Sequence, residues 1–188
     1  MFMSSGIEGP ADAEDGCTCE YSGGPASNCC TLPMTSRDRS DARSGFSAAL
    51  VISVLAYLTL NTAAGAWLMF SFGATVFIVF VLYKLETAQP KNIFFGHLVS
   101  IIVGIIFNKT IGFSFVSLGL SVGVAVMLMV YLKIMHPPAA SNPIVALFMD
   151  SSYDFILFPV ITGTIVIILM AVLINKVILK RNYPSKWF

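Results

Sequence analysis

The sequence predicts an all-α protein, a polytopic bundle of membrane helices with four to five apolar segments, some broken by proline or glycine. Of its 188 residues, 56% are hydrophobic and only 11% are charged, whereas soluble domains carry about 25% charged residues. The mean hydropathy is +0.82. Short polar connectors separate the apolar segments, as expected for helices that cross or enter a bilayer. We therefore expect an integral, multi-pass protein of a plasma, inner or plastid membrane.

Two parts of the chain differ in composition. Residues 1–45 are rich in Gly, Ser, Pro and acidic residues and are predicted to form a disordered tail. Residues 46–188 form the membrane domain, with apolar segments at about 46–62, 66–83, 93–107, 115–135 and 155–174. In this domain eight Lys or Arg residues stand against three acidic residues, a net charge of +5. Such a charge suits an anionic solute or anionic lipid.

The distribution of basic residues predicts an even number of spans. Arg37, Arg39 and Arg43 precede the first segment, and Lys176, Lys180, Arg181 and Lys186 follow the last. Both termini are therefore expected on the cytoplasmic side. The segment Ile93–Phe107 is short, because a full span needs about 20 residues. We expect four spans plus this short or re-entrant element, which would place Lys84, Lys91 and Lys109 inside. Five full spans are the alternative.

The fourth segment carries a small-residue motif. Gly119 and Gly123 form a GxxxG pair, and such pairs let two helices approach closely. This contact can form within the bundle or between two copies of the chain. A homo-oligomer is expected, because so few helices enclose a pore poorly.

Prolines break the chain directly after the fourth segment. His136-Pro137-Pro138-Ala139-Ala140-Ser141-Asn142-Pro143 holds three prolines, and proline cannot continue a helix. Non-helical backbone at membrane depth is tolerated only where it is buried in protein or lines a water-filled cavity. Transporters handle ions and small solutes at such breaks. Pro137 and Pro138 therefore mark a candidate site.

Histidines and amides supply the candidate chemistry. His136 is the first candidate, since histidine both donates and accepts hydrogen bonds and titrates near neutral pH; capping the carbonyls that end the fourth helix is the alternative. His97 is the second, either in the same site or bonded to a neighbouring helix. If the two histidines meet, they can form a proton-linked site or hold an anion. Asn142 is expected to cap a short helix over 143–149.

Two further motifs offer donors to an anion. Asn92 is expected to cap the third helix, where Lys91 attracts an anion or simply follows the charge rule for membrane proteins. Gly73, in Ser71-Phe72-Gly73-Ala74-Thr75, is expected to let part of the second segment unwind and expose N–H groups and hydroxyls.

Four motifs in order resemble the HPP family of integral membrane proteins. They are Ser71-Phe72-Gly73-Ala74, Gln89-Pro90-Lys91-Asn92 with Gly96-His97, the segment His136–Pro143, and Tyr183-Pro184-Ser185-Lys186-Trp187. The resemblance covers about residues 46–188 and implies four membrane-spanning helices. It also implies transport, and nitrite in particular for plastid and cyanobacterial members. Ala139-Ala140-Ser141 departs from the Ala-Gly-Ala often found in the family.

Enzyme motifs are absent from the sequence, so no catalytic activity and no cofactor are expected. There is no H-E-x-x-H pattern, P-loop or nucleophile elbow. The four cysteines Cys17, Cys19, Cys29 and Cys30 lie in the tail. They can bind a soft metal, carry a lipid or remain free thiols, and their spacing is not that of a standard zinc site.

The sequence thus predicts a protein that moves a small solute, an inorganic anion, with the histidines available to couple protons; the family resemblance alone implies nitrite. The expected partners are the bilayer, the anion and further copies of the chain, and no nucleic acid. An anion channel without coupling is one alternative. The other is a membrane scaffold or sensor that acts through the N-terminal tail.

Overall fold

The computed structural model describes residues 36–61 and 68–185. The tail cysteines and residues 1–35 of the predicted disordered tail fall outside these residues, whereas residues 36–45 of that tail form the start of a helix. The described part is built from helices and loops, without a strand. Its helices are α1 (Ser36–Asn61), α2 (Phe70–Val81), α3 (Pro90–Thr110), α4 (Phe115–Tyr131), α5 (Asn142–Phe148) and α6 (Thr162–Leu173). Short helical turns accompany them: η1 (Glu86–Ala88), η2 (Pro137–Ser141), η3 (Ile156–Ile161) and η4 (Ile174–Ile178).

Three helices of the described part are long and apolar enough to cross a membrane. They are Ala42–Asn61 in α1, Pro90–Thr110 (α3), and Ile156–Ile178, which joins η3, α6 and η4. The shorter α2 and α4 are also apolar. The all-α membrane architecture and its five apolar segments are confirmed, but the expectation that four or five of the segments are full spans is wrong, because only three of the described helices are long enough. The expected re-entrant segment at Ile93–Phe107 is also wrong, because the polar residues on either side of it continue the helix to 21 residues.

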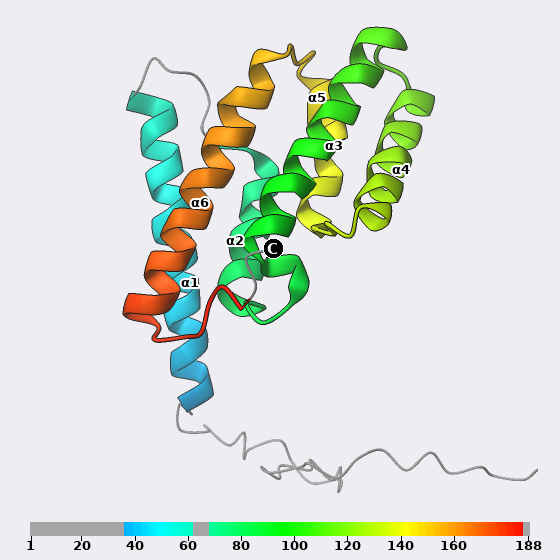
Figure 1. The fold of residues 1–188 in the computed structure, drawn as a ribbon. Helices are drawn as coiled ribbons and strands as arrows, with labels where there is room; N and C mark the ends of the chain where they lie inside the picture. The colour runs from blue at the N-terminus through cyan, green and yellow to red at the C-terminus, as the bar shows by residue number, and fades with distance from the viewer. Residues whose placement is uncertain (1–35, 62–67, 186–188) are drawn as a thin grey trace, which may run out of the picture. The chain divides into compact units, whose positions relative to one another are not determined.

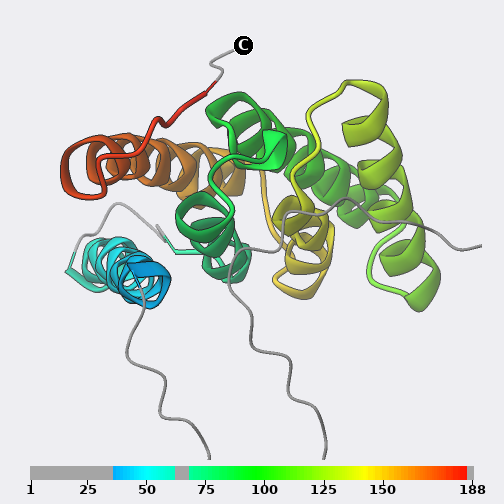
Figure 2. The same cartoon turned by 90° about the horizontal axis from the view of Figure 1, so that it is seen from below.

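α3 lies in the middle of the arrangement. It packs against α4 and α5 on one side and against α6 on the other, while α1 and α2 pack against each other and against α6. Figures 1 and 2 show this order from two directions. Large side chains from four helices, including Leu55, Phe72, Ile101 and Ile167, fill the core between α1, α2, α3 and α6.

The first and last described segments lie at the same end of the bundle. Nη1 of Arg181 donates to the carbonyl of Phe80 at 2.6 Å, and Nη2 of the same residue donates to Oγ of Ser44 at 3.2 Å. The phenol of Tyr183 donates to the carbonyl of Ala88 at 2.8 Å, and burial raises its pKa. These contacts join the start of α1, the end of α2 and the start of α3, so α1, α2, α3 and α6 alternate in direction.

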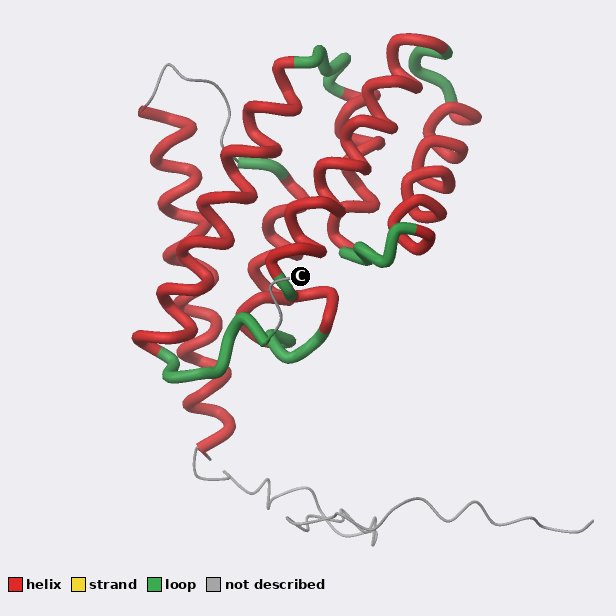
Figure 3. The backbone as a smooth tube through the Cα atoms, in the orientation of Figure 1, coloured by secondary structure: helices red, strands yellow, loops and turns green. Residues whose placement is uncertain are grey.

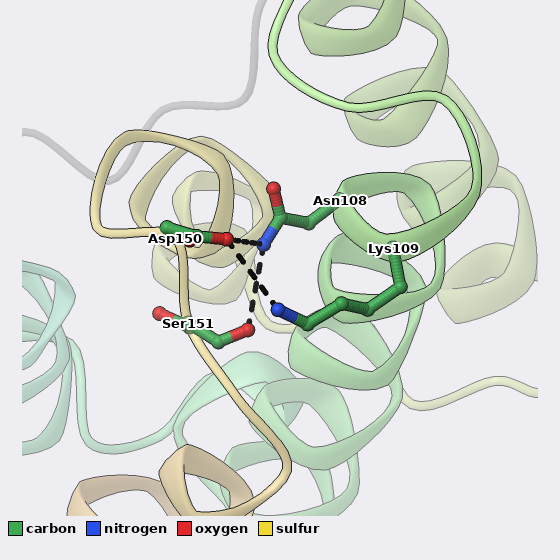
Figure 4. A network of polar contacts seen from close by, with 4 residues as sticks. All are labelled: Asn108, Lys109, Asp150 and Ser151. Atoms are coloured by element: carbon green, nitrogen blue, oxygen red, sulfur yellow. Dashed lines mark hydrogen bonds and ion pairs between the residues drawn. The ribbon is translucent and has the colours of Figure 1, made fainter.

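At the other end of the bundle, a polar contact holds the C-terminal ends of α3 and α5 together (Figure 4). Nδ2 of Asn108 donates to Oδ1 of Asp150 at 2.9 Å, and Nζ of Lys109 lies 3.4 Å from the same oxygen. The Asn108 amide and then the Lys109 ammonium hold the pKa of the Asp150 carboxyl below its usual value. Lys109 therefore lies at the other end of α3 from Lys91. The expectation that these two lysines share one side of the membrane is wrong.

The proline-rich break lies beside the body of α3 rather than beyond its end. A Cβ on Gly96 would lie 2.8 Å from Cβ of His136, and one on Gly104 would lie 2.6 Å from Cα of Pro143. Gly96 is six residues, or about 9 Å, along a helix that rises 1.5 Å per residue. In Figure 3 the loop between α4 and α5 accordingly lies between the levels of the end loops. The pair of α4 and α5 thus enters and returns from one end.

Candidate functional site

Two buried histidines meet where the break contacts α2 and α3. His97 comes from α3 and His136 from the segment between α4 and η2; both are at most 1% exposed. Their ring centroids are 5.1 Å apart and their planes are inclined by 57°. The absence of a side chain at Gly96 permits this approach, because a Cβ there would collide with the Cβ of His136. The two histidines therefore meet, which is the arrangement that a proton-linked or anion-binding site between them requires.

The hydroxyl of Thr75, on α2, bridges the two rings. Its Oγ1 lies 3.0 Å from Nε2 of His97 and 3.1 Å from Nε2 of His136. It also lies 3.1 Å from the carbonyl of Ser71, one turn earlier in α2. Since Thr75 is fully buried, water does not compete for these contacts.

The outer nitrogens of the two histidines have different partners. Nδ1 of His136 lies 2.7 Å from the carbonyl of Thr87 in η1, so it carries a proton and donates. Nδ1 of His97 lies 3.0 Å from Nδ2 of Asn142, so it accepts. The same Asn142 amide donates to the backbone carbonyl of His97 at 3.2 Å. We call Thr75, Thr87, His97, His136 and Asn142 the histidine junction.

Two buried polar atoms at the junction have no protein partner. Oδ1 of Asn142 is one, and Oγ of Ser71, one turn before Thr75 on the buried face of α2, is the other. Buried polar atoms are nearly always hydrogen-bonded, so an unpaired one calls for water or a solute. They are an unpaired acceptor on the residue that binds His97 and an unpaired hydroxyl one turn before Thr75.

A hollow of about 270 Å³ lies on the outer side of the break. Its walls come from α4 and from the broken segment, and they include Met129, Met135, His136 and Pro137. A small inorganic anion is much smaller than this volume, but the hollow is lined by apolar surface and His136 is only 1% exposed. The hollow therefore marks open space beside the break and not an opening to the ring nitrogens.

Prolines and backbone contacts hold the break in place. Pro138 is buried in η2 and Pro137 is exposed beside the hollow. Oγ of Ser100 on α3 donates to the carbonyl of Ala139 at 2.5 Å. α4 ends through its own backbone, because the amides of Lys133 and Ile134 donate to the carbonyls of Val130 and Met129. The alternative that His136 caps these carbonyls is therefore wrong.

Two predicted capping roles are corrected by the geometry. Asn142 does not cap α5, which has Ser141 in that position; its amide binds His97 instead. Asn92 does not cap α3 either, because Gln89 precedes Pro90 at the helix start and Pro is favoured in the first turn. The Asn92 amide donates to the carbonyl of Glu86 at 2.9 Å.

Gly73 and Lys91 lie outside the junction. Gly73 is exposed within the continuous helix α2, and a Cβ there would meet nothing within 4 Å. The expected unwinding at Gly73 is therefore wrong. Lys91 lies half-buried in the first turn of α3, six residues before His97. It is an approach residue for an anion at most, because its side chain takes no part in the described hydrogen bonds of the junction.

The sequence does not predict the roles of Thr75 and Thr87, which bind the histidines through a side-chain hydroxyl and a backbone carbonyl. Thr75 stood in a segment expected to unwind, yet its hydroxyl acts from an intact helix. Thr87 contributes a backbone carbonyl, which leaves no signature in the side-chain sequence. The alternation of small and aromatic residues on α2 is the available signal for Thr75, since Ser71 and Thr75 fall one turn apart on the face that also buries Phe72.

Among the described residues, no three side chains of His, Cys, Asp or Glu lie close enough together to bind a metal ion. The fold and junction instead define a polytopic α-helical membrane protein with a buried polar site. The transmembrane region of the HPP family matches residues 35–184. The chain belongs to this family.

Two curated relatives are described as transmembrane proteins. Two transmembrane proteins of Dictyostelium discoideum are 28% and 29% identical over 151 and 153 residues, which cover 76% and 77% of this chain. Those stretches make up 53% and 49% of the relatives, so the chain spans about half of their length. No solved structure matches the chain.

Proposed function

We propose that the protein transports a small inorganic anion, such as nitrite, across its membrane in step with protons. The observation that carries this proposal is the histidine junction, where two titratable rings lie buried at a helix break among apolar helices. Ionisable residues within membrane helices are costly and usually functional. The choice of nitrite comes from the family resemblance.

The polar groups around the junction suit a small anion. Ser71 offers a free hydroxyl, and a proton on His136 supplies a positive charge that attracts an anion. At the end of the bundle nearest the junction, basic residues outnumber acidic ones and attract anions; they include Arg43, Lys84, Lys91, Lys176, Lys180 and Arg181.

Reconstituted protein tests the proposal directly. We expect nitrite uptake into proteoliposomes to rise when an inward proton gradient is imposed. His136→Ala should reduce uptake by about a hundredfold, which is the size of effect typical for losing a proton-transferring group. Lys109→Gln, which changes a residue at the other end of α3, is the control and should retain uptake.

Other outcomes separate the rival functions. Uptake that ignores the proton gradient would indicate a channel. Loss of activity on deletion of residues 1–36, with His136→Ala unaffected, would indicate a scaffold or sensor that acts through the tail. A folded, reconstituted protein that moves no anion of a panel including nitrite, nitrate and chloride would refute transport.

We further propose that two copies of the chain associate along α4. Gly119 and Gly123 face outward, and a Cβ on either would meet nothing within 4 Å. The predicted close contact within one chain is thus not made, which leaves the contact between copies. Ser117, Ser121 and Ala125 form the face that α4 buries within the chain instead. A hollow of about 450 Å³, lined by Gly119 and by apolar residues of α4 and α5, lies on the same outward face.

Cysteine cross-linking tests this association. In a background without the tail cysteines, Gly123→Cys should form a disulfide-linked dimer in native membranes under mild oxidation. Ala125→Cys, which is buried against the chain's own helices, should not. Equal cross-linking of both variants, or of neither, would contradict a contact along the GxxxG face.

A further inference from the structure

We infer that the histidine junction stores a single proton on His136, and that the hydroxyl of Thr75 is the switch that accommodates it. The inference rests on the proposed transport and deepens it. It predicts that one proton enters with each monovalent anion.

The uncharged junction has one consistent set of hydrogen-bond directions. Nδ2 of Asn142 donates to Nδ1 of His97, so the proton of His97 resides on Nε2 and points to Oγ1 of Thr75. His136 donates from Nδ1 to the carbonyl of Thr87, so its Nε2 accepts the single proton of the Thr75 hydroxyl. Both rings are then neutral and every ring nitrogen has a partner.

A proton added to His136 leaves all of these atoms paired. Nε2 of His136 becomes a donor to Oγ1 of Thr75, which already accepts from His97 and has a second lone pair for this bond. The Thr75 hydroxyl then rotates, and its proton moves to the carbonyl of Ser71, which lies 3.1 Å away. The only rearrangement required is this rotation, so the charged state costs no hydrogen bond.

A proton added to His97, in contrast, cannot be accommodated by rotating a neighbouring group. Its Nδ1 already faces the Asn142 amide group, whose second N–H is committed to the His97 carbonyl. Protonation would set two donors against each other, and turning the amide would bring its oxygen toward that carbonyl. A second proton is also opposed by the first, because the two rings are 5.1 Å apart in a medium of low dielectric.

The surroundings supply no competing charge at the junction. α2, α5 and α6 carry no Asp, Glu, Lys, Arg or His. The titratable residues nearest along the other packed elements are at least partly exposed, apart from the buried phenol that binds the carbonyl of Ala88; they are Glu86, Lys91, Tyr131, Lys133 and Tyr183. The stored charge therefore stays uncompensated until an anion binds, which couples one proton to one negative charge.

Nitrogen-15 NMR of the full chain in lipid bilayers tests the inference. The chain has only two histidines, so labelled imidazole signals are readily assigned with a His97→Gln variant. At neutral pH we expect His97 to carry its proton on Nε2 and His136 on Nδ1. On acidification one ring, His136, should become doubly protonated while His97 keeps its tautomer.

Thr75→Val and Thr75→Ser form the matched pair of variants. Valine has the size of threonine but no hydroxyl, so it should shift the titration of His136 by about one pH unit or more and abolish the response of uptake to a proton gradient. Serine keeps the hydroxyl and should behave like the wild type in both measurements.

The two readouts distinguish the inference from the proposed function. The inference is overturned if both rings titrate together, if the wild-type tautomers are reversed, or if Thr75→Val titrates like the wild type. The wild-type spectra decide this even if a variant misfolds. If the spectra agree and no anion is transported, the proposed function alone fails.

Discussion

Gly104→Ala is expected to destabilise the protein strongly although it adds a single methyl group. The new Cβ would lie 2.6 Å from Cα of Pro143 and 2.8 Å from Cβ of Ala146. Because the first of these is a backbone atom, α5 must move away from α3. Overpacking of this kind costs about 1–3 kcal/mol. For a domain of this size that corresponds to roughly 2–4 °C of melting temperature for each kcal/mol.

The control substitutes another glycine within an apolar helix. Gly73→Ala meets open space, and alanine favours a helix over glycine by about 1 kcal/mol, so its melting temperature should stay level or rise. Thermal unfolding of both variants in one detergent measures the difference. If Gly104→Ala melts like the wild type, the close approach of α5 to α3 is incorrect. A loss of anion uptake in folded Gly104→Ala protein would further link the position of the break to function.

The position of the break shows how far sequence reasoning reaches. Three prolines dictate that a helix ends near His136 whatever surrounds it, because proline lacks an N–H and clashes with the preceding turn. The depth of this break depends on which helix it packs against. That contact is made by the small surfaces of Gly96 and Gly104 on α3, and nothing in the local pattern distinguishes them from other glycines.

Local signals misled where one residue type serves two purposes. Asn before Pro is a common start for a helix, yet the Asn142 amide donates to His97, 45 residues away in sequence. The polar residues that flank Ile93–Phe107 looked like ends of a short segment. They are instead the end turns of a longer helix, where polar side chains reach the membrane surface or the helix termini. Such choices are made by tertiary contacts.

Asn142→Leu is expected to have the largest effect on function for a change that keeps the branched shape and the number of heavy atoms of the side chain. Nδ1 of His97 would lose its donor, and the backbone carbonyl of His97 would keep only the bond that it accepts within helix α3. A buried acceptor left without a partner, as Nδ1 would be, costs about 1–3 kcal/mol. His97 would also be free to move its proton to Nδ1, and the single Thr75 hydroxyl would then face two accepting Nε2 atoms. The ordered junction would be lost.

Asn175→Leu is the matched control for this change. Asn175 is equally buried, its amide donates to the carbonyl of Ala171 one turn earlier, and its Oδ1 is also unpaired. It lies near the end of the last apolar helix and shares no hydrogen bond with the junction, so its loss should affect stability alone. Anion uptake per folded protein, measured beside the melting temperature, separates the two. Asn142→Leu should lose uptake beyond what its melting temperature explains, because it removes the donor that fixes the tautomer of His97. Proton-dependent uptake retained in Asn142→Leu would mean that this tautomer, and with it the direction of the whole hydrogen-bond chain, is irrelevant to transport.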